Sequence, residues 1–319
     1  MRKLAPRSFP IILAYHTLDP PDFLKSILGI RYDSLDFEQQ IRYLSSHHPI
    51  ISMDEFLRWF SGGGSIPENA VMVTFDDGYR DIIDIALPLF RELSIPATVF
   101  LTTGCIGTGK SLWTNILYNM LYHSNCKNIS LFSGKDTPLN LDLCGSTEEI
   151  ASGVRKLTGA LKRMDDRFRN DELKSLAKQL GFSGLPDPHE SLPMLSWEQV
   201  KMLSENHFTM GSHSVCHPIL SECDLERQSS EIADSRKAIE ANCGTSCRVF
   251  AYPNGQPEDF TEETQRLVEL SGYEAAFAFF PGVIHPGRNR YSIYRHPVFD
   301  VPLATFAAAL TKRKWHAIR

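Results

Sequence analysis

An apolar run that ends in two carboxylates and a glycine is the most informative stretch of this sequence: Ala70-Val71-Met72-Val73-Thr74-Phe75-Asp76-Asp77-Gly78. Its β-branched and aromatic residues predict a buried strand, and the glycine permits a sharp exit from it. Two adjacent carboxylates at the end of a buried strand cannot both stay unpaired in a low-dielectric site. A bound cation would neutralise one of them and leave the other available as a base. On its own, Asp-Asp-Gly also fits a solvated turn.

Around this stretch, short β-rich runs alternate with helical patterns, which is typical of an α/β architecture with a parallel sheet. We expect strands at 10–15, 70–75, 97–101, 207–210, 249–252, 274–279 and 292–294, and helices at 37–44, 81–93, 225–242 and 302–311. Pro88 should kink or break the second of these helices, because proline lacks the backbone N–H that a helix interior requires.

The alternation of strand and helix patterns stops between residues 104 and 193. Helical patterns at 113–122 and 153–180 follow each other there, with no strand that we can assign between them. We interpret this segment as a helical insertion, carried on a βα loop of a single domain that spans 1–319. Such an excursion could cap an active site at the carboxyl face of a barrel. It could equally be a lateral elaboration far from the chemistry, and the sequence favours neither.

A second motif places two histidines four residues apart, His213 and His217, just after the strand expected at 207–210. Neutral imidazole suits zinc and other first-row metals, and two such ligands can converge on one ion. Cys216 lies between them and is interpreted as a bystander thiol. Both motifs follow predicted strands, at the face where barrel sites are built. Two histidines and Asp77 would leave coordination positions open, as catalytic metal sites do.

The two motifs together resemble those of the polysaccharide deacetylases, the NodB-homology carbohydrate esterases. Three segments carry the resemblance: Thr74-Phe75-Asp76-Asp77-Gly78, His213-Ser214-x-x-His217-Pro218 and Phe250-Ala251-Tyr252-Pro253-Asn254-Gly255, the last in a variant form of the family's third motif. The likeness covers roughly residues 10 to 301, with the insertion inside it. It implies a distorted (β/α)7 barrel and a divalent metal, commonly zinc.

The resemblance also implies a role for each matching residue. The metal ligands would be Asp77, His213 and His217, and Asp76 would be the general base that takes a proton from water. The metal would lower the pKa of water and polarise the amide carbonyl. A backbone N–H at Asn254 would help to hold the tetrahedral oxyanion.

The sequence departs from the family pattern at two places. The third motif often carries an arginine that pairs with the catalytic aspartate, and here that position is Ala251. Arg295, from a late strand, is the best substitute, although an ordinary surface ion pair is the alternative for it. The second departure concerns the general acid that protonates the leaving amine. His16 resembles the histidine of family members with a rearranged barrel order, and His296 is the other candidate.

The composition of the chain restricts the classes of partner and the cellular compartment that we expect. The formal net charge is −5 and the pI about 6.1, and no stretch concentrates Lys and Arg on one face, which argues against nucleic acid as a partner. Seven cysteines without framework spacing suggest mostly free thiols. The sequence shows neither a signal peptide nor an apolar run long enough to span a membrane. We therefore expect a cytoplasmic protein.

The leading functional hypothesis is hydrolysis of an N-acetyl group on an amino sugar of a polysaccharide or its biosynthetic intermediate, such as a lipid-linked one. One alternative keeps the metal but changes the substrate to a small non-sugar amide. Another is a non-catalytic carbohydrate-binding relative, which Ala251 and the unassigned acid motivate. The intact Asp76 speaks against a pure binder, because binding requires no free base beside a metal site.

Overall fold

The computed structural model describes residues 9–28, 33–124, 128–131, 139–142, 146–186, 192–298 and 301–312. The amino-terminal residues considered above for a signal peptide lie largely outside these ranges. No helix within the described ranges is both long and apolar enough to cross a membrane.

A seven-stranded sheet forms the centre of the molecule, and its paired strands all run parallel. Its members are β1 (Ile11–Tyr15), β2 (Val71–Phe75), β3 (Ala97–Leu101), β6 (Phe208–Ser212), β7 (Val249–Ala251), β8 (Ala275–Phe277) and β9 (His296–Pro297). They are ordered β8-β7-β6-β3-β2-β1-β9, and Ile293, just before β9, forms a bridge to Phe277 of β8. The two edges therefore meet, and the sheet curls into the expected distorted (β/α)7 barrel.

Side chains along the strands alternate between two apolar clusters. The outer cluster includes Leu13, Val73, Val99, Phe250 and Ala276 together with residues of the surrounding helices. The inner cluster includes Ile12, Met72, Phe100, Ala251 and Phe277 together with Phe56 from α3. Because successive residues of a strand point to opposite faces, this division tells which residues near the strand ends face the barrel interior.

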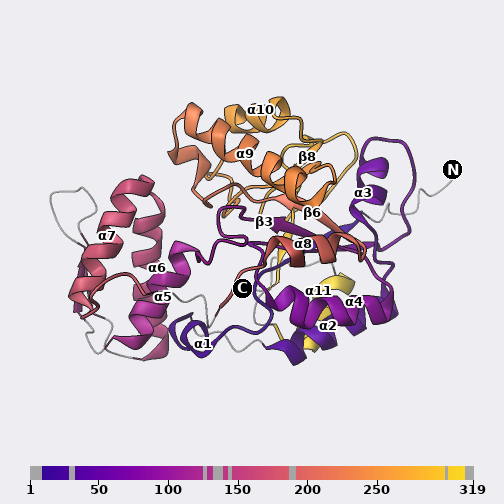
Figure 1. Cartoon of the computed structure of the whole chain (residues 1–319). Coiled ribbons are helices and arrows are strands. Elements are labelled where there is room, and N and C mark those ends of the chain that lie inside the picture. Colours follow the sequence, from indigo (N-terminus) through magenta and orange to yellow (C-terminus); the bar gives the residue numbers. More distant parts are fainter. Residues whose placement is uncertain are drawn as a thin grey trace.

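Helices surround this barrel. They are α1 (Asp22–Leu28), α2 (Ser34–His47), α3 (Met53–Phe60), α4 (Leu87–Leu93), α5 (Trp113–His123), α6 (Thr147–Lys162), α7 (Asp166–Gln179), α8 (Trp197–Ser204), α9 (Leu225–Cys243), α10 (Glu262–Leu270) and α11 (Leu303–Lys312). In Figure 1, α9 and α10 lie above the sheet, α2, α4 and α11 lie below it, and α5 to α7 stand apart at the left.

Most predicted elements of the barrel are confirmed within a few residues. The expected helix at 81–93 is divided, because Ile82–Ala86 is a π-helical turn and α4 begins beside Pro88. The last strand was expected at 292–294, and the structure places β9 at His296–Pro297 instead. That strand has only two residues and directly follows the charged Arg295, so it does not have the apolar pattern that identified the others.

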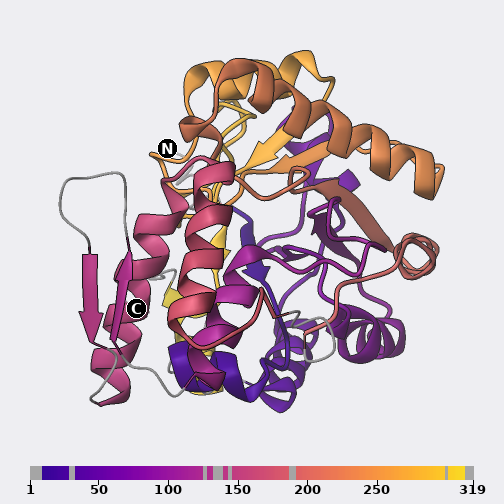
Figure 2. The same cartoon turned by 60° about the vertical axis from the view of Figure 1, so that its left-hand side comes forward.

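The segment between β3 and α8 contains three helices with an apolar core of their own. Leu117 of α5, Leu157 of α6 and Leu176 of α7 are buried in this core. Ile27 of α1, the helix that follows β1, packs in the same core. The prediction of no strand here is wrong, because β4 (Asn128–Leu131) and β5 (Leu139–Asp142) form an antiparallel hairpin, visible at the outer edge in Figure 2. Each strand has only four residues, too few for a clear periodicity.

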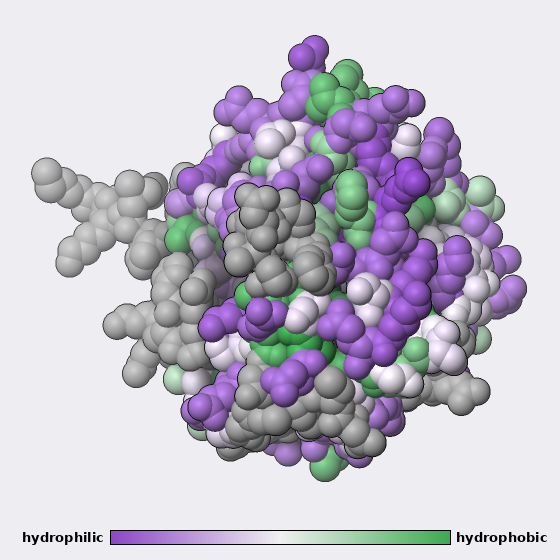
Figure 3. Space-filling model, turned by 90° about the vertical axis from the view of Figure 1, so that its left-hand side faces the viewer, coloured by the Kyte–Doolittle hydropathy of each residue, from purple (hydrophilic) through white to green (hydrophobic). Residues whose placement is uncertain are grey.

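The outer face of this segment is largely hydrophilic, with one hydrophobic area near the middle of the view in Figure 3. The segment touches the barrel at the carboxyl ends of its strands, through contacts described below.

Candidate active site

Two consecutive carboxylates leave β2 in different directions. The Asp76 N–H donates to the Tyr15 carbonyl at 2.9 Å and so continues the sheet ladder. Asp77 has a φ of 71°, a left-handed conformation that costs a non-glycine residue energy and reverses the chain sharply. The next residue, Gly78, also has positive φ, and a Cβ there would lie 2.8 Å from the Ile106 side chain. The turn therefore requires this glycine, and it turns both carboxylates toward the barrel's carboxyl end.

The loop after β6 supplies two histidines whose orientations are fixed by hydrogen bonds. His213 donates its backbone N–H to the Leu101 carbonyl at 2.8 Å, and its Nδ1 lies 2.7 Å from the Ala251 carbonyl. A carbonyl can only accept, so Nδ1 carries the proton and Nε2 is left with its lone pair. His217 has a φ of 57° and donates its N–H to Ser214 Oγ at 3.0 Å.

The loop's backbone is held from below by Glu231 of α9. Its Oε2 accepts hydrogen bonds from the N–H groups of Val215 and Cys216, both at 2.8 Å. The Cys216 side chain is exposed and is not part of the histidine cluster. These positions agree with the interpretation of Cys216 as a bystander.

Three donor atoms, one each from Asp77, His213 and His217, lie within 4.8 Å of one another. Asp77 Oδ1 is 3.5 Å from His217 Nε2 and 3.8 Å from His213 Nε2. Two donors about 2.1 Å from one zinc ion at a tetrahedral angle stand about 3.4 Å apart, so this spacing fits a shared ion. Asp77 Oδ1 is also buried without a hydrogen-bond partner among the described residues. A divalent cation would fit these donors.

Asp76 is held by a buried arginine. Arg295 is 0 % exposed and donates to both carboxylate oxygens, at 2.6 and 2.8 Å, with a further bond to Thr74 Oγ1 at 3.2 Å. Its guanidinium carbon lies 4.9 Å from the centroid of the Phe100 ring. Such a bidentate pair fixes the carboxylate in one orientation. The arginine missing at Ala251 is thus replaced from the other edge of the sheet.

The two carboxylates have pKa values that are pushed in opposite directions. Burial would raise the pKa of Asp76, but the charge and the hydrogen bonds of Arg295 outweigh it and lower the pKa to about 2. Burial and the neighbouring charge of Asp76 raise the pKa of Asp77 to about 8. Neighbouring groups separated in this way take different roles in catalytic sites. Asp76 stays ionised, and a cation bound beside Asp77 would favour the ionised form of that carboxyl.

His16 and His296, the two candidates for the general acid, lie on opposite faces of the sheet. His296 pairs in register with Leu13, an outer-cluster residue, and Val298 two positions later is in the same cluster. Its side chain therefore points toward the helices. Arg295, one residue earlier, points inward.

His16 follows Tyr15, an outer residue, and so faces the barrel interior, where its ring contacts Phe279 edge-on at 5.1 Å. Burial lowers the pKa of His16 to about 4, although the charge of Asp76 opposes this effect. Of the two candidates, only His16 is on the side of the sheet that carries Asp76.

Asn254 lies in the turn after β7 with a φ of 59°. Its side-chain oxygen accepts a hydrogen bond from Nζ of Lys162, the last residue of α6. Nothing in the sequence marked this lysine, which ends an ordinary amphipathic helix. The same is true of Asn115 in α5, which bonds the Tyr79 hydroxyl at 3.3 Å, while Tyr79 in turn hydrogen-bonds the Asp77 carboxylate.

The sequence profile described as polysaccharide deacetylase matches residues 63–276, about two thirds of the chain. The chain belongs to the polysaccharide deacetylase family. The match spans β2 to β8 and so contains both carboxylates and both histidines, and it confirms the family resemblance.

Individual relatives are more distant. A poly-β-1,6-N-acetyl-D-glucosamine N-deacetylase from Staphylococcus aureus is 32% identical over 108 residues, which is 30% of this chain and 37% of that protein. The chain thus aligns with little more than a third of this curated relative. IcaB from Ammonifex degensii has 18% identity and a TM-score of 0.61, over 95% of this chain and 97% of that one. The deacetylase PplD from Streptococcus pyogenes, in complex with acetate, has 14% sequence identity and a TM-score of 0.60, again over 95% of this chain and 97% of that one. These structures establish the fold of this family for the chain.

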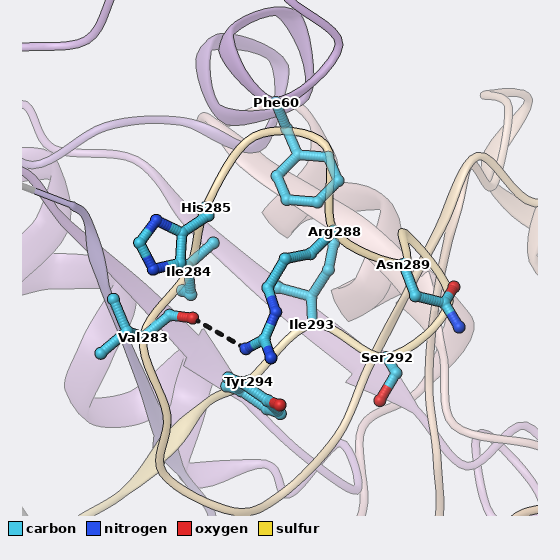
Figure 4. Close-up of a pocket in the computed structure, with 9 residues that line it drawn as sticks. All are labelled: Phe60, Val283, Ile284, His285, Arg288, Asn289, Ser292, Ile293 and Tyr294. Carbon is cyan, nitrogen blue, oxygen red and sulfur yellow. Dashed lines mark hydrogen bonds between the residues drawn. The ribbon is translucent and has the colours of Figure 1, made fainter.

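A small surface pocket lies elsewhere, beside α3. Its lining is Phe60, Val283, Ile284, His285, Arg288, Asn289, Ser292, Ile293 and Tyr294. Figure 4 shows Arg288 in the middle of it, donating to the Val283 carbonyl at 3.3 Å and lying over the Tyr294 ring. None of the carboxylates and histidines described above lines it, so this pocket is separate from the candidate active site.

Proposed function

We propose that the protein is a metal-dependent hydrolase that removes the N-acetyl group from an amino sugar of a polysaccharide such as poly-N-acetylglucosamine. One observation carries the proposal: a carboxylate locked by a buried arginine stands beside an Asp-His-His donor set. His213 Nε2 is 4.0 Å from Asp76 Oδ2 and 3.8 Å from Asp77 Oδ1. A binding protein would gain nothing from a buried charge held ready next to such a donor set.

The donor set is proposed to hold zinc. A divalent ion held there by Asp77, His213 and His217 would lower the pKa of water and polarise the acetamide carbonyl. Asp76 then accepts the proton of the attacking water as its oxygen bonds to the carbonyl carbon. Arg295 keeps the Asp76 carboxylate in a single orientation for this transfer. The C–N bond breaks next, giving acetate and the free amine of the sugar.

Two further residues are proposed to act at the oxyanion and at the leaving group. The backbone N–H of Asn254, in the turn that follows β7, would stabilise the negative charge that develops on the carbonyl oxygen. His16 would deliver a proton to the departing amine. Burial keeps His16 neutral in the resting site, so it must take up a proton from solvent before the water attacks, and the charge of Asp76, which is still ionised at that point, favours this gain.

The decisive experiment measures acetate release and metal content together. Purified protein is analysed for bound metal and incubated with N-acetylglucosamine oligomers, a poly-N-acetylglucosamine and a panel of small non-sugar amides. We expect acetate from the sugars only, loss of release after chelation, and recovery with zinc. Release from small amides alone would shift the assignment to that substrate class. A metal-loaded protein without turnover on any of these substrates would contradict the proposal.

Three finer statements remain predictions. We propose that the chain acts as one barrel domain in which 104–193 is an insertion, which limited proteolysis can test. A lipid-linked sugar intermediate belongs in the substrate panel as a separate arm. The cytoplasmic location that we expect from the sequence can be tested by fractionation of the source cells.

A further inference from the structure

The last residue of α6 carries a cation from the insertion into the rim of the active site. Lys162 Nζ donates to Asn254 Oδ1, across 92 residues of sequence. Lys162 is half-buried, and burying an ammonium group is unfavourable unless acceptors and opposite charges surround it. The carboxylate of Asp259 is the negative charge that acts on it most strongly. Residues of the barrel therefore hold this lysine side chain in place, and it does not extend freely into solvent.

Ion pairs on either side hold the end of α6 in this place. Arg163 pairs with Glu222 at 2.9 Å, and Asp166 at the start of α7 pairs with Arg227 at 2.6 Å. Arg227 also contacts Glu231, the residue that binds the backbone of the histidine loop. Single exposed pairs stabilise little, but several around one helix end restrict how it can sit. The insertion is thus attached to the loops that form the site.

The turn that Lys162 contacts has an unusual backbone conformation, which depends on the identity of its residues. Asn254 and Gly255 both have positive φ, and the Gly255 N–H bonds the Pro253 carbonyl at 2.7 Å. A Cβ on Gly255 would lie 2.7 Å from the Phe279 backbone nitrogen, so the turn is packed tightly. Asparagine tolerates the left-handed region better than most residues, and anchoring its side chain selects that conformation over others.

We propose that Lys162 is a positioning residue of the deacetylase site, which holds the Asn254 turn so that its backbone N–H faces the developing oxyanion. The inference rests on the proposed function and makes the insertion a working part of the site. It also answers the question that the sequence left open, because a lateral elaboration would not reach this turn.

The experiment compares four single variants and one double variant of the full chain. Lys162→Met keeps the length of the side chain and removes the donor, and Lys162→Arg restores a donor and the charge. Lys156→Met is the matched control, since Lys156 is exposed on the same helix. Asn254→Ala, alone and combined with Lys162→Met, tests whether the lysine acts through the asparagine. The readouts are kcat, KM and hydrogen exchange of the peptide that contains residues 250–256.

We expect Lys162→Met to lower kcat about 10-fold with little change in KM, because oxyanion contacts count mainly in the transition state. Lys162→Arg should recover most of this loss, and Lys156→Met should match the wild type. The double variant should be no slower than Asn254→Ala alone, since both changes break one contact. Exchange of the 250–256 peptide should rise in Lys162→Met, in Asn254→Ala and in the double variant, but not in Lys162→Arg or Lys156→Met.

Three results would overturn the inference. They are unchanged exchange in Lys162→Met, additive losses in the double variant, or a rise in KM that accounts for the whole effect. The exchange readout needs no turnover. An inactive wild type would therefore count against the proposed function, while the contact between Lys162 and the turn would still be tested.

Discussion

The two ends of the barrel are built in opposite ways. At the amino end, α3 inserts Phe56 against Met72 and Phe277, and the interior there is apolar and fully packed. At the carboxyl end, the same interior holds Asp76 and Arg295 as a buried ion pair, beside the donor set of Asp77, His213 and His217. The difference teaches that apolar packing and chemistry are separated along the barrel axis. Packing at one end supports buried charge at the other.

The largest expected effect is on activity at the carboxyl end. Asp76→Asn should lower kcat by about 10²–10⁴, the usual contribution of a general base, while bound zinc is retained. The control is Asp54→Asn, because Asp54 is an exposed carboxylate in the first turn of α3, at the amino end. Acetate release and metal content are measured on folded protein of both variants. Comparable activity of Asp76→Asn and wild type would remove Asp76 from the mechanism.

The next effect should appear in stability alone. Phe56→Ala removes a fully buried ring from the amino end, and such truncations cost about 3–5 kcal/mol of unfolding free energy. We expect urea unfolding to show this loss while zinc affinity below the unfolding transition stays within about threefold of the wild type, a change of under 1 kcal/mol. A large loss of zinc affinity in this variant would mean that the two ends are coupled.

A smaller effect concerns acid sensitivity of the carboxyl end. The folded state holds His16 with a pKa of about 4, below its ordinary value of 6.5. The unfolded chain therefore binds a proton first, and stability falls as the pH drops from about 6.5 to 4. The loss is at most about 3 kcal/mol, at 1.36 kcal/mol per pKa unit, and is reduced because part of the ring reaches solvent.

His16→Gln should flatten this part of the pH profile of unfolding free energy. The measurement compares wild type and variant in urea at pH 7, 6, 5 and 4, because other buried histidines titrate in both proteins and cancel in the difference. Parallel profiles would show that His16 is not buried in neutral form.

The smallest effect is expected in the pocket beside α3. Arg288→Ala removes one hydrogen bond to a carbonyl and one contact with the Tyr294 ring, both near the surface. We expect a loss of about 0.5–1 kcal/mol in thermal unfolding and unchanged acetate release. A loss of activity here would assign the pocket to the deacetylase reaction and contradict the separation of the two ends.

The sequence predicted the barrel well for a physical reason. Buried parallel strands are continuous apolar runs bounded by charged or turn-forming residues, and six of the seven could be located in this way. The seventh, β9, has only two residues, and the inward-facing charge of Arg295, directly before His296, interrupts the apolar pattern. Adjacent residues of a strand face opposite sides, so only one of this pair could have pointed into the site.

The sequence allowed site residues in short motifs to be predicted. It did not reveal residues such as Lys162 and Asn115, which reach the site only through tertiary contacts. Asp76 and His213 belong to short patterns with a chemical meaning. Lys162 and Asn115 lie in helices whose sequences show only ordinary amphipathic spacing, and their contacts with Asn254 and Tyr79 arise when the insertion packs on the barrel. The hairpin of β4 and β5 was missed because four residues are too few to distinguish a strand.

The pairing of Asp76 with Arg295 also constrains how the chain is made. The two residues are 219 positions apart. At about 5–20 residues per second, the ribosome needs roughly 10 to 45 seconds to reach the arginine after the aspartate has been synthesised. Throughout this interval the nascent carboxylate has no counter-charge, and its burial is unfavourable. The pair can therefore form at the catalytic end of the barrel only after Arg295 has been translated.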